Sequence, residues 1–533
     1  MIRPTILAFL LAAGLPLAAL PQTRPVSHSR MILEADIDTL QREMAAGRLT
    51  SQALVRAYLD RIRRVDRAGP KVNSVIETNP DALAIARALD AERKAGRVRG
   101  PLHGIPVLLK DNIDTGDRMM TSAGSLALLG APAAQDAFIV KRLRMAGAVI
   151  LGKTNLSEWA NIRSGKSTSG WSARGGQTKN PYVLDRNPCG SSSGTGTAIA
   201  ASFATVGIGT ETDGSIVCPA NMNGLVGLKP TVGFASRAGI VPISHSQDTA
   251  GPMTRTVKDA AIVLGALAGA DPADPSTREA NGRVVADYRA FLDAGGLEGA
   301  RIGVARKRVT GYSVHADRLF EAALADLKRL GAELVDPADF GSIGEYDDDE
   351  LEVLLYELKD DLDRYLATRT GVPVRTLADV IAFNEKHADR EMPFFGQELF
   401  VRAQAKGPLT EAAYLEALAK SRRLARAGID DVMKANRLDA IVAPTTGPAW
   451  LTDHLNGDSY SGSSSTPAAV AGYPHITVPM GQAHGLPVGL SFVGGAWTEG
   501  VLLKLAYAYE QGTRHRKAPA FVRSATLPDG PRE

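Results

Sequence analysis

Short apolar runs alternate with longer amphipathic segments along most of this chain, and no other feature restricts its fold as strongly. The clearest run, IPVLLK at residues 105–110, stays apolar up to its final lysine, as expected of a strand buried on both faces. Further strands are predicted at residues 148–151, 206–210, 225–228, 302–305, 441–443, 475–478 and 489–493. Helices are predicted at residues 37–46, 51–66, 81–95, 136–146, 156–162 and 197–205. This alternation indicates an α/β architecture with a mixed sheet.

The chain has 533 residues and no recognisable linker, so it can bury a large core as one unit. Residues 344–407 have a helical pattern and many charges, which predicts an insertion over the sheet, such as a lid. The 61 basic and 58 acidic residues nearly balance, for a net charge of +3. This balance argues against nucleic acid or an anionic membrane as the main partner. No pattern indicates an oligomeric state.

The first 21 residues have the pattern of a secretory signal peptide. Arg3 precedes an apolar run that starts at Ile6 and ends in the small residues Ala18 and Ala19. About 14 apolar residues are too few to span ~30 Å of hydrocarbon, so an uncleaved anchor is the weaker interpretation. The pattern therefore predicts an exported protein, periplasmic or secreted, without a stable membrane anchor.

Two cysteines and nine histidines offer little for metal chemistry. Cys189 and Cys218 are too few for an all-cysteine zinc site, and no H-E-x-x-H or H-x-H pattern occurs. We therefore expect no metal and no cofactor. Export permits a disulfide, but the sequence leaves open whether the two cysteines pair.

Residues 188–220 read PCGSSSGTGTAIAASFATVGIGTETDGSIVCPA, with two loops of small residues around one helix and one strand. Glycine and serine suit a backbone that must adopt positive φ or approach a ligand closely. A flexible linker is the usual meaning of such composition, but the apolar helix and strand between the loops argue against it. The segment is therefore a candidate functional site.

These two loops resemble the amidase signature family, whose pattern is G-G-S-S-G-G-S followed by G-[ST]-D-x-G-G-S-[IV]. The nucleophilic serine follows the first serine of that pair by 24 positions in the family, and Ser215 follows Ser191 by the same spacing. Further matches are GIPVLLKD at 104–111, LGKTNL at 151–156, GLKPT at 227–231, SQDTAGP at 246–252, APT at 443–445 and GLPVGL at 485–490. The resemblance covers residues 32–514. It implies one large domain, about residues 30–520, with a mixed, mostly parallel central sheet covered by helices.

The resemblance also implies a catalytic triad of Ser215, Ser191 and Lys110. A serine hydroxyl is a weak nucleophile until a base removes its proton, and a lysine acts as a base only when burial lowers its pKa far below ~10.4. Lys110 ends an apolar strand, where desolvation is expected. In the family the relay serine follows a cis peptide bond, here Gly190–Ser191.

An oxyanion hole is expected from the backbone N–H groups of Thr212, Asp213, Gly214 and Ser215. One such donor contributes roughly 3 kcal/mol to the transition state. The chain departs from the family's common pattern here, with Glu211 in place of Asp, Asp213 in place of Gly, and Val217 in place of Arg.

Other catalytic arrangements fit less well. Gly190 to Gly194 spells G-x-S-x-G with Ser192 as the nucleophile, but no strand leads into that turn. A Ser–His–Asp triad would use His245 and Asp248 with Ser215. GKS at 165–167 is like the end of a phosphate-binding loop, but Ala160 replaces its leading glycine.

The expected substrate is a small-molecule or peptide amide, above all the C-terminal carboxamide of a peptide, with release of ammonia. This follows from a likeness of CGSSSG, TETDGSIVCPA, SQDTAGPM and AGYPHITVPMG to one branch of the family. Aryl and fatty-acyl amides remain alternatives. Two further alternatives are a non-catalytic exported binding protein and one of the family's tRNA-amidating subunits. The intact triad argues against the first, and the signal peptide against the second.

Overall fold

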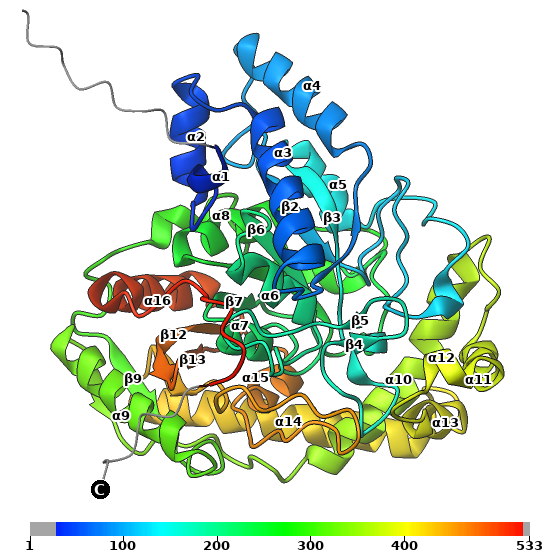
Figure 1. Cartoon of the computed structure of the whole chain (residues 1–533). Helices are drawn as coiled ribbons and strands as arrows, with labels where there is room; N and C mark the ends of the chain where they lie inside the picture. Colours follow the sequence, from blue (N-terminus) through cyan, green and yellow to red (C-terminus); the bar gives the residue numbers. More distant parts are fainter. Residues whose placement is uncertain (1–27, 526–533) are drawn as a thin grey trace, which may run out of the picture.

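A computed structural model describes residues 28–525 of the chain (Figure 1). They form a single large α/β domain around an eleven-stranded sheet of order β1-β3-β2-β6-β8-β7-β12-β13-β11-β9-β10. The predicted signal peptide at residues 1–21 lies outside the described residues. The strands of the sheet are β1 (Val75–Thr78), β2 (Pro106–Lys110), β3 (Val149–Thr154), β6 (Val206–Glu211), β7 (Val226–Lys229), β8 (Thr249–Thr254), β9 (Arg301–Val304), β10 (Glu333–Val335), β11 (Ala440–Pro444), β12 (His475–Ala483) and β13 (Leu486–Val493).

The sheet is mixed, as predicted. Parallel pairing is limited to two groups, β3-β2-β6 and β11-β9-β10, and the other neighbours run antiparallel. A separate hairpin joins β4 (Trp171–Ser172) and β5 (Gly176–Gln177). The first parallel group brings the carboxyl ends of β2 and β6 to the same edge of the sheet, where loops commonly carry functional residues.

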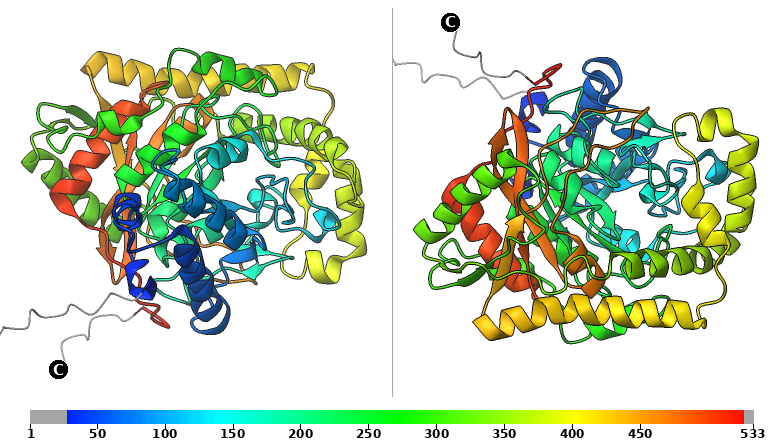
Figure 2. Two further views of the ribbon diagram at one scale, coloured as in Figure 1. Left: turned by 90° about the horizontal axis from the view of Figure 1, so that it is seen from above. Right: turned by 90° about the horizontal axis from the view of Figure 1, so that it is seen from below.

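Two groups of helices cover the sheet (Figures 1 and 2). Helices α8, α9 and α16 pack on β8 and β12, and the short helices α6 and α7 pack on β6, β7 and β13. The helices are α1 (His28–Met31), α2 (Ile37–Ala45), α3 (Ser51–Arg61), α4 (Ala82–Lys94), α5 (Phe138–Met145), α6 (Ser193–Ala200), α7 (Val217–Met222), α8 (Val257–Leu267), α9 (Val314–Arg329), α10 (Asp347–Thr368), α11 (Leu377–Lys386), α12 (Ala388–Glu391), α13 (Glu398–Gln404), α14 (Ala412–Asn436), α15 (Thr466–Ala471) and α16 (Glu499–Thr513). Among the described residues, none of the helices combines the length and apolarity that a membrane crossing requires.

Helix α6 is buried along its whole length, which explains its small residues. A Cβ atom on Gly194 would lie 2.4 Å from the carbonyl oxygens of Asn155 and Ser74, so only glycine permits this approach of the helix to β3 and β1. The predicted helix at 197–205 is therefore real but begins and ends earlier, at Ser193 and Ala200.

The predicted helix at 156–162 is wrong. The structure has a 3₁₀ segment at Glu158–Asn161 in which Trp159 and Ala160 take left-handed backbone angles, with φ of 50° and 54°. The Trp159 N–H donates to the carbonyl of Ala123 at 2.9 Å, so a distant loop fixes the turn. Tertiary contacts override the local apolar spacing here.

The charged segment 344–407 contains helices α10 to α13, which gather at one end of the molecule, where α10 packs beside α14 (Figures 1 and 2). Helix α10 holds the loop before β8 through its carboxylates. Gln247 donates to Glu350 at 2.8 Å, the hydroxyls of Ser244 and Ser246 donate to Glu357, and the His245 ring lies 2.8 Å from Asp361.

Candidate active site

Lys110 ends β2 with its side chain fully buried. Its Nζ lies 2.7 Å from the Ser191 hydroxyl, 2.8 Å from the Thr210 hydroxyl and 3.2 Å from the Thr210 carbonyl. Asn112 donates to the same Thr210 hydroxyl at 2.9 Å. The parallel pairing of β2 with β6 produces this contact, because Thr210 lies near the carboxyl end of β6.

Burial lowers the pKa of Lys110 from 10.5 to about 7, while the carboxylates of Asp248 and Glu211 act in the opposite direction. At neutral pH a large fraction of this amine is therefore uncharged, and an uncharged amine accepts a proton. The expected desolvated lysine at the end of a strand is thus present, in direct contact with Ser191.

Ser191 follows a cis Gly190–Ser191 peptide bond. Its carbonyl accepts the N–H of Ser157 at 3.1 Å. The next residue, Ser192, donates its hydroxyl to the Thr210 carbonyl at 3.1 Å and accepts the Thr210 N–H at 3.2 Å. The Ser192 hydroxyl therefore attaches its loop to β6 through two hydrogen bonds. This argues against the G-x-S-x-G interpretation with Ser192 as nucleophile.

Ser215 lies in the turn between β6 and α7, with 8% of its surface exposed. The Ser192 N–H donates to the Ser215 carbonyl at 3.1 Å, so the turn with Ser215 is hydrogen-bonded to the loop with Ser191. The structure thus brings Lys110 and Ser191 into contact and places the segment of Ser215 beside them.

The turn before Ser215 presents backbone N–H groups. Gly214 has a φ of 77°, which glycine adopts without strain. Within residues 28–525, the four N–H groups predicted for the oxyanion hole make no hydrogen bond to another residue; they belong to Thr212, Asp213, Gly214 and Ser215. The side chains of two of these residues form hydrogen bonds with other parts of the chain. The Thr212 hydroxyl donates to Asp248 at 2.6 Å, and the Asp213 carboxylate accepts from the Thr466 hydroxyl at 2.6 Å.

Glu211 fixes the far side of the same turn. Its buried carboxylate accepts the N–H groups of Ile216 at 2.7 Å and Val217 at 3.0 Å. Burial raises the pKa of Glu211, and the charge of buried Lys229 opposes this rise. Burial in turn lowers the pKa of Lys229 to about 8. The sequence shows Glu211 only as a departure from the family pattern, and its place four residues before Ser215 is the signal that could have revealed this role.

His245 and Asp248 do not form a triad with Ser215. The His245 ring lies 2.8 Å from Asp361 and 3.3 Å from Glu357, both on α10. Asp248 accepts the Thr212 hydroxyl and the N–H groups of Ile243 and Ser244, so its role is to shape the loop. A cavity of about 580 Å³ reaches both residues, but none of the three predicted triad residues lines it.

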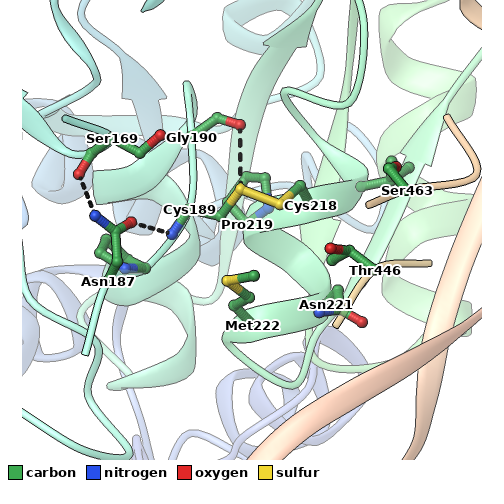
Figure 3. Close-up of a disulfide and its surroundings, with 12 residues drawn as sticks. Ser169, Asn187, Cys189, Gly190, Cys218, Pro219, Asn221, Met222, Thr446 and Ser463 are labelled. Atoms are coloured by element: carbon green, nitrogen blue, oxygen red, sulfur yellow. Dashed lines mark hydrogen bonds between the residues drawn. A yellow bond between two sulfur atoms is a disulfide. The ribbon is translucent and has the colours of Figure 1, made fainter. Parts of the chain in front are cut away.

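Cys189 and Cys218 form a disulfide, with their Cα atoms 6.0 Å apart. Figure 3 shows the bond between the loop with Gly190 and the helix with Pro219 and Met222. The question that the sequence left open is therefore answered for this structure: the two cysteines pair.

The model of the Amidase family matches residues 53–503, and the chain therefore belongs to the amidase family. This confirms the resemblance drawn from the sequence motifs and identifies the chain as a hydrolase that acts on amides. The solved peptide amidase of Stenotrophomonas maltophilia is 56% identical with a TM-score of 0.88, over 92% of this chain and 99% of that one.

More distant relatives span the same length. A protein of Arabidopsis thaliana named Probable amidase is 44% identical over 93% of each chain. A glutamyl-tRNA(Gln) amidotransferase subunit from Symbiobacterium thermophilum is 35% identical, over 91% of this chain and 98% of that one. The fold is thus shared by proteins whose names describe different reactions.

Proposed function

We propose that this chain hydrolyses carboxamides through an acyl-enzyme on Ser215, with Ser191 as proton relay and Lys110 as general base. The observation that carries the proposal is the fully buried Lys110 amine, 2.7 Å from the Ser191 hydroxyl, with a pKa lowered to about 7. A neutral amine in that position suits activation of a serine hydroxyl.

In the first half of the reaction, Lys110 takes the Ser191 proton while Ser191 takes the proton of Ser215. The Ser215 oxygen attacks the amide carbon, and the resulting oxyanion accepts hydrogen bonds from the free backbone N–H groups of residues 212–215. The C–N bond then breaks, and the proton on Lys110 returns through Ser191 to the departing nitrogen, which leaves as ammonia or an amine.

In the second half, water replaces the amine. Its proton passes through Ser191 to Lys110 as its oxygen attacks the acyl carbon. The C–O bond to Ser215 breaks, the proton returns to Ser215, and the carboxylic acid leaves. The three residues end the cycle in their starting protonation states.

The proposed substrate is the C-terminal carboxamide of a peptide. The 56% identity to a protein named peptide amidase supports this choice over aryl and fatty-acyl amides. Export to an oxidising compartment is also part of the proposal, because a buried disulfide in an enzyme is typical of proteins outside the cytosol.

The test uses three substrates with one peptide sequence: its C-terminal amide, its free acid and its anilide. We expect ammonia from the amide, no reaction of the free acid and little aniline from the anilide. Aniline without ammonia would favour an arylamidase, and cleavage within the free acid would contradict amidase action. The Ser215→Ala variant is the matched control for contaminating activity, and it should release nothing.

A further inference from the structure

The disulfide links the two segments that carry the proposed catalytic serines. Cys189 stands two residues before Ser191, and Cys218 stands three residues after Ser215. Between the two cysteines the chain passes through α6 and β6, so the bond closes a loop of the chain that contains both serines.

We propose that the Cys189–Cys218 bond is a positioning element for the reaction, holding the Ser191 loop against the Ser215 turn. The inference rests on the proposed function for its kinetic readout, and it adds a role for two residues that take no part in the proton transfers. The sulfur atoms themselves touch no reacting group in this scheme.

The backbone of Cys189 supports the proposal independently. Its φ is 60°, in the left-handed region that favours glycine. A cysteine with a Cβ atom is the less favourable choice for such a backbone, so its side chain must contribute something that glycine lacks. The bond to Cys218 is that contribution.

Both ends of the bond connect closely to the serines. The Cys218 N–H donates at 2.8 Å to the carbonyl of Gly214, the residue immediately before Ser215. The Cys189 N–H donates at 2.8 Å to the Asn187 side chain, and only Gly190 separates Cys189 from Ser191. A displacement of α7 is therefore transmitted to both loops through short, defined connections.

Weaker connections run beside the bond. Asn223 donates to the carbonyls of Pro188 at 3.0 Å and Pro219 at 2.7 Å, and the Ser192 N–H donates to the Ser215 carbonyl at 3.1 Å. These hydrogen bonds keep the loops near each other after reduction, so we expect a loss of alignment rather than separation. A displacement of about 1 Å lowers a rate by about 10²-fold when it misplaces reacting groups.

The chain offers an unusually direct test, because these are its only two cysteines. A dithiol reductant breaks the S–S bond by exchange, giving two thiols while the dithiol closes to a cyclic disulfide. Cys189 and Cys218 are 4% and 2% exposed, so reduction must be verified by thiol titration before any assay. An effect of verified reduction on the rate then belongs to this bond.

Reduction should lower kcat on a peptide amide at least tenfold, leave KM within about twofold and be reversed by reoxidation. The acid limb of the pH profile should also move to higher pH, because a loosened Ser191 loop admits water to Lys110. The Cys189→Ala/Cys218→Ala double variant should have the kcat of the reduced enzyme, and the reductant should not change it. Far-ultraviolet circular dichroism checks that each form is folded.

A second readout separates this inference from the proposed function. The rate at which a fluorophosphonate labels Ser215 reports on the nucleophile without any amide substrate. Slower labelling after reduction, in a protein that hydrolyses no amide, would support the positioning role and contradict the amidase proposal. Equal kcat and equal labelling in both redox states would overturn the positioning role, as would full activity of a Cys189→Gly/Cys218→Ala variant.

Discussion

Protonation of Lys110 should switch off the enzyme in acid. In the proposed mechanism only the uncharged amine accepts the proton that passes through Ser191, and burial lowers the pKa of Lys110 to about 7. We therefore expect kcat/KM to fall tenfold for each pH unit below about 6, and to level off above about pH 8.

The value of that pKa determines how much of the Lys110 amine is uncharged at a given pH. At pH 7 an amine with a pKa of about 7 is half uncharged, whereas an ordinary lysine at 10.5 is uncharged in only about 3 molecules in 10⁴. Burial thus supplies about a 10³-fold increase in the active form at neutral pH.

The assay is ammonia release from a peptide amide between pH 5 and 9, with kcat/KM reporting the free enzyme. Asp248 needs a control, because burial raises its pKa to about 6 and its carboxylate raises the pKa of Lys110. The Asp248→Asn variant should retain the acid limb and move it to lower pH. Lys110→Ala should abolish turnover.

Two results would refute this reasoning. A constant kcat/KM between pH 5 and 8 would mean that catalysis does not require any group with a pKa near 7 to lose a proton. An acid limb that vanishes in Asp248→Asn would assign the titration to Asp248 and remove Lys110 as the base.

Three further variants test the remaining assignments. Ser215→Ala should lower kcat by at least about 10⁴-fold with an unchanged thermal melt, and residual turnover close to wild type would exclude it as the nucleophile. His245→Ala should change kcat only a few-fold, whereas a fall of ~10²–10⁴ would identify a general base. Lys110→Met should raise the free energy of unfolding at pH 7 by about 1–3 kcal/mol, because placing a charged amine in this site costs about 4 kcal/mol and the lost hydrogen bonds offset part of the gain. The pKa of Lys110 is lower in the folded state than in the unfolded state, so the free energy of unfolding of the wild type rises between about pH 7 and 10.5. Urea titrations across that window should therefore show a shrinking stability difference between Lys110→Met and the wild type.

The sequence was sufficient for features that depend on local pattern or motif spacing. The apolar run before Lys110 predicted a buried strand, and the family spacing placed Ser191 and Ser215 in adjacent segments. The motif also indicated the cis peptide before Ser191, which is present. These features can be predicted because the residues that define them lie within a few positions of one another or belong to one recurring pattern.

Features set by distant contacts escaped prediction. Strand β8 contains Gly251 and Pro252, which usually argue against a central strand. A Cβ atom on Gly251 would lie 2.0 Å from the Leu228 carbonyl, so close packing in the sheet requires glycine there. The left-handed turn at Trp159 depends on a loop more than thirty residues earlier, and pairing of two cysteines 29 residues apart depends on the folded backbone.

The attachment of α10 to the loop before β8 limits how the family fold can vary. Glu350, Glu357 and Asp361 form hydrogen bonds to residues 244–247, and the next residue, Asp248, accepts a hydrogen bond from Thr212 in the turn before Ser215, the proposed nucleophile. A replacement of this helix by a shorter or differently charged one is therefore expected to loosen the turn with Thr212 and Ser215 as well. Engineering of new substrate preferences through α10 must keep these three carboxylates, or supply other acceptors for the same donors.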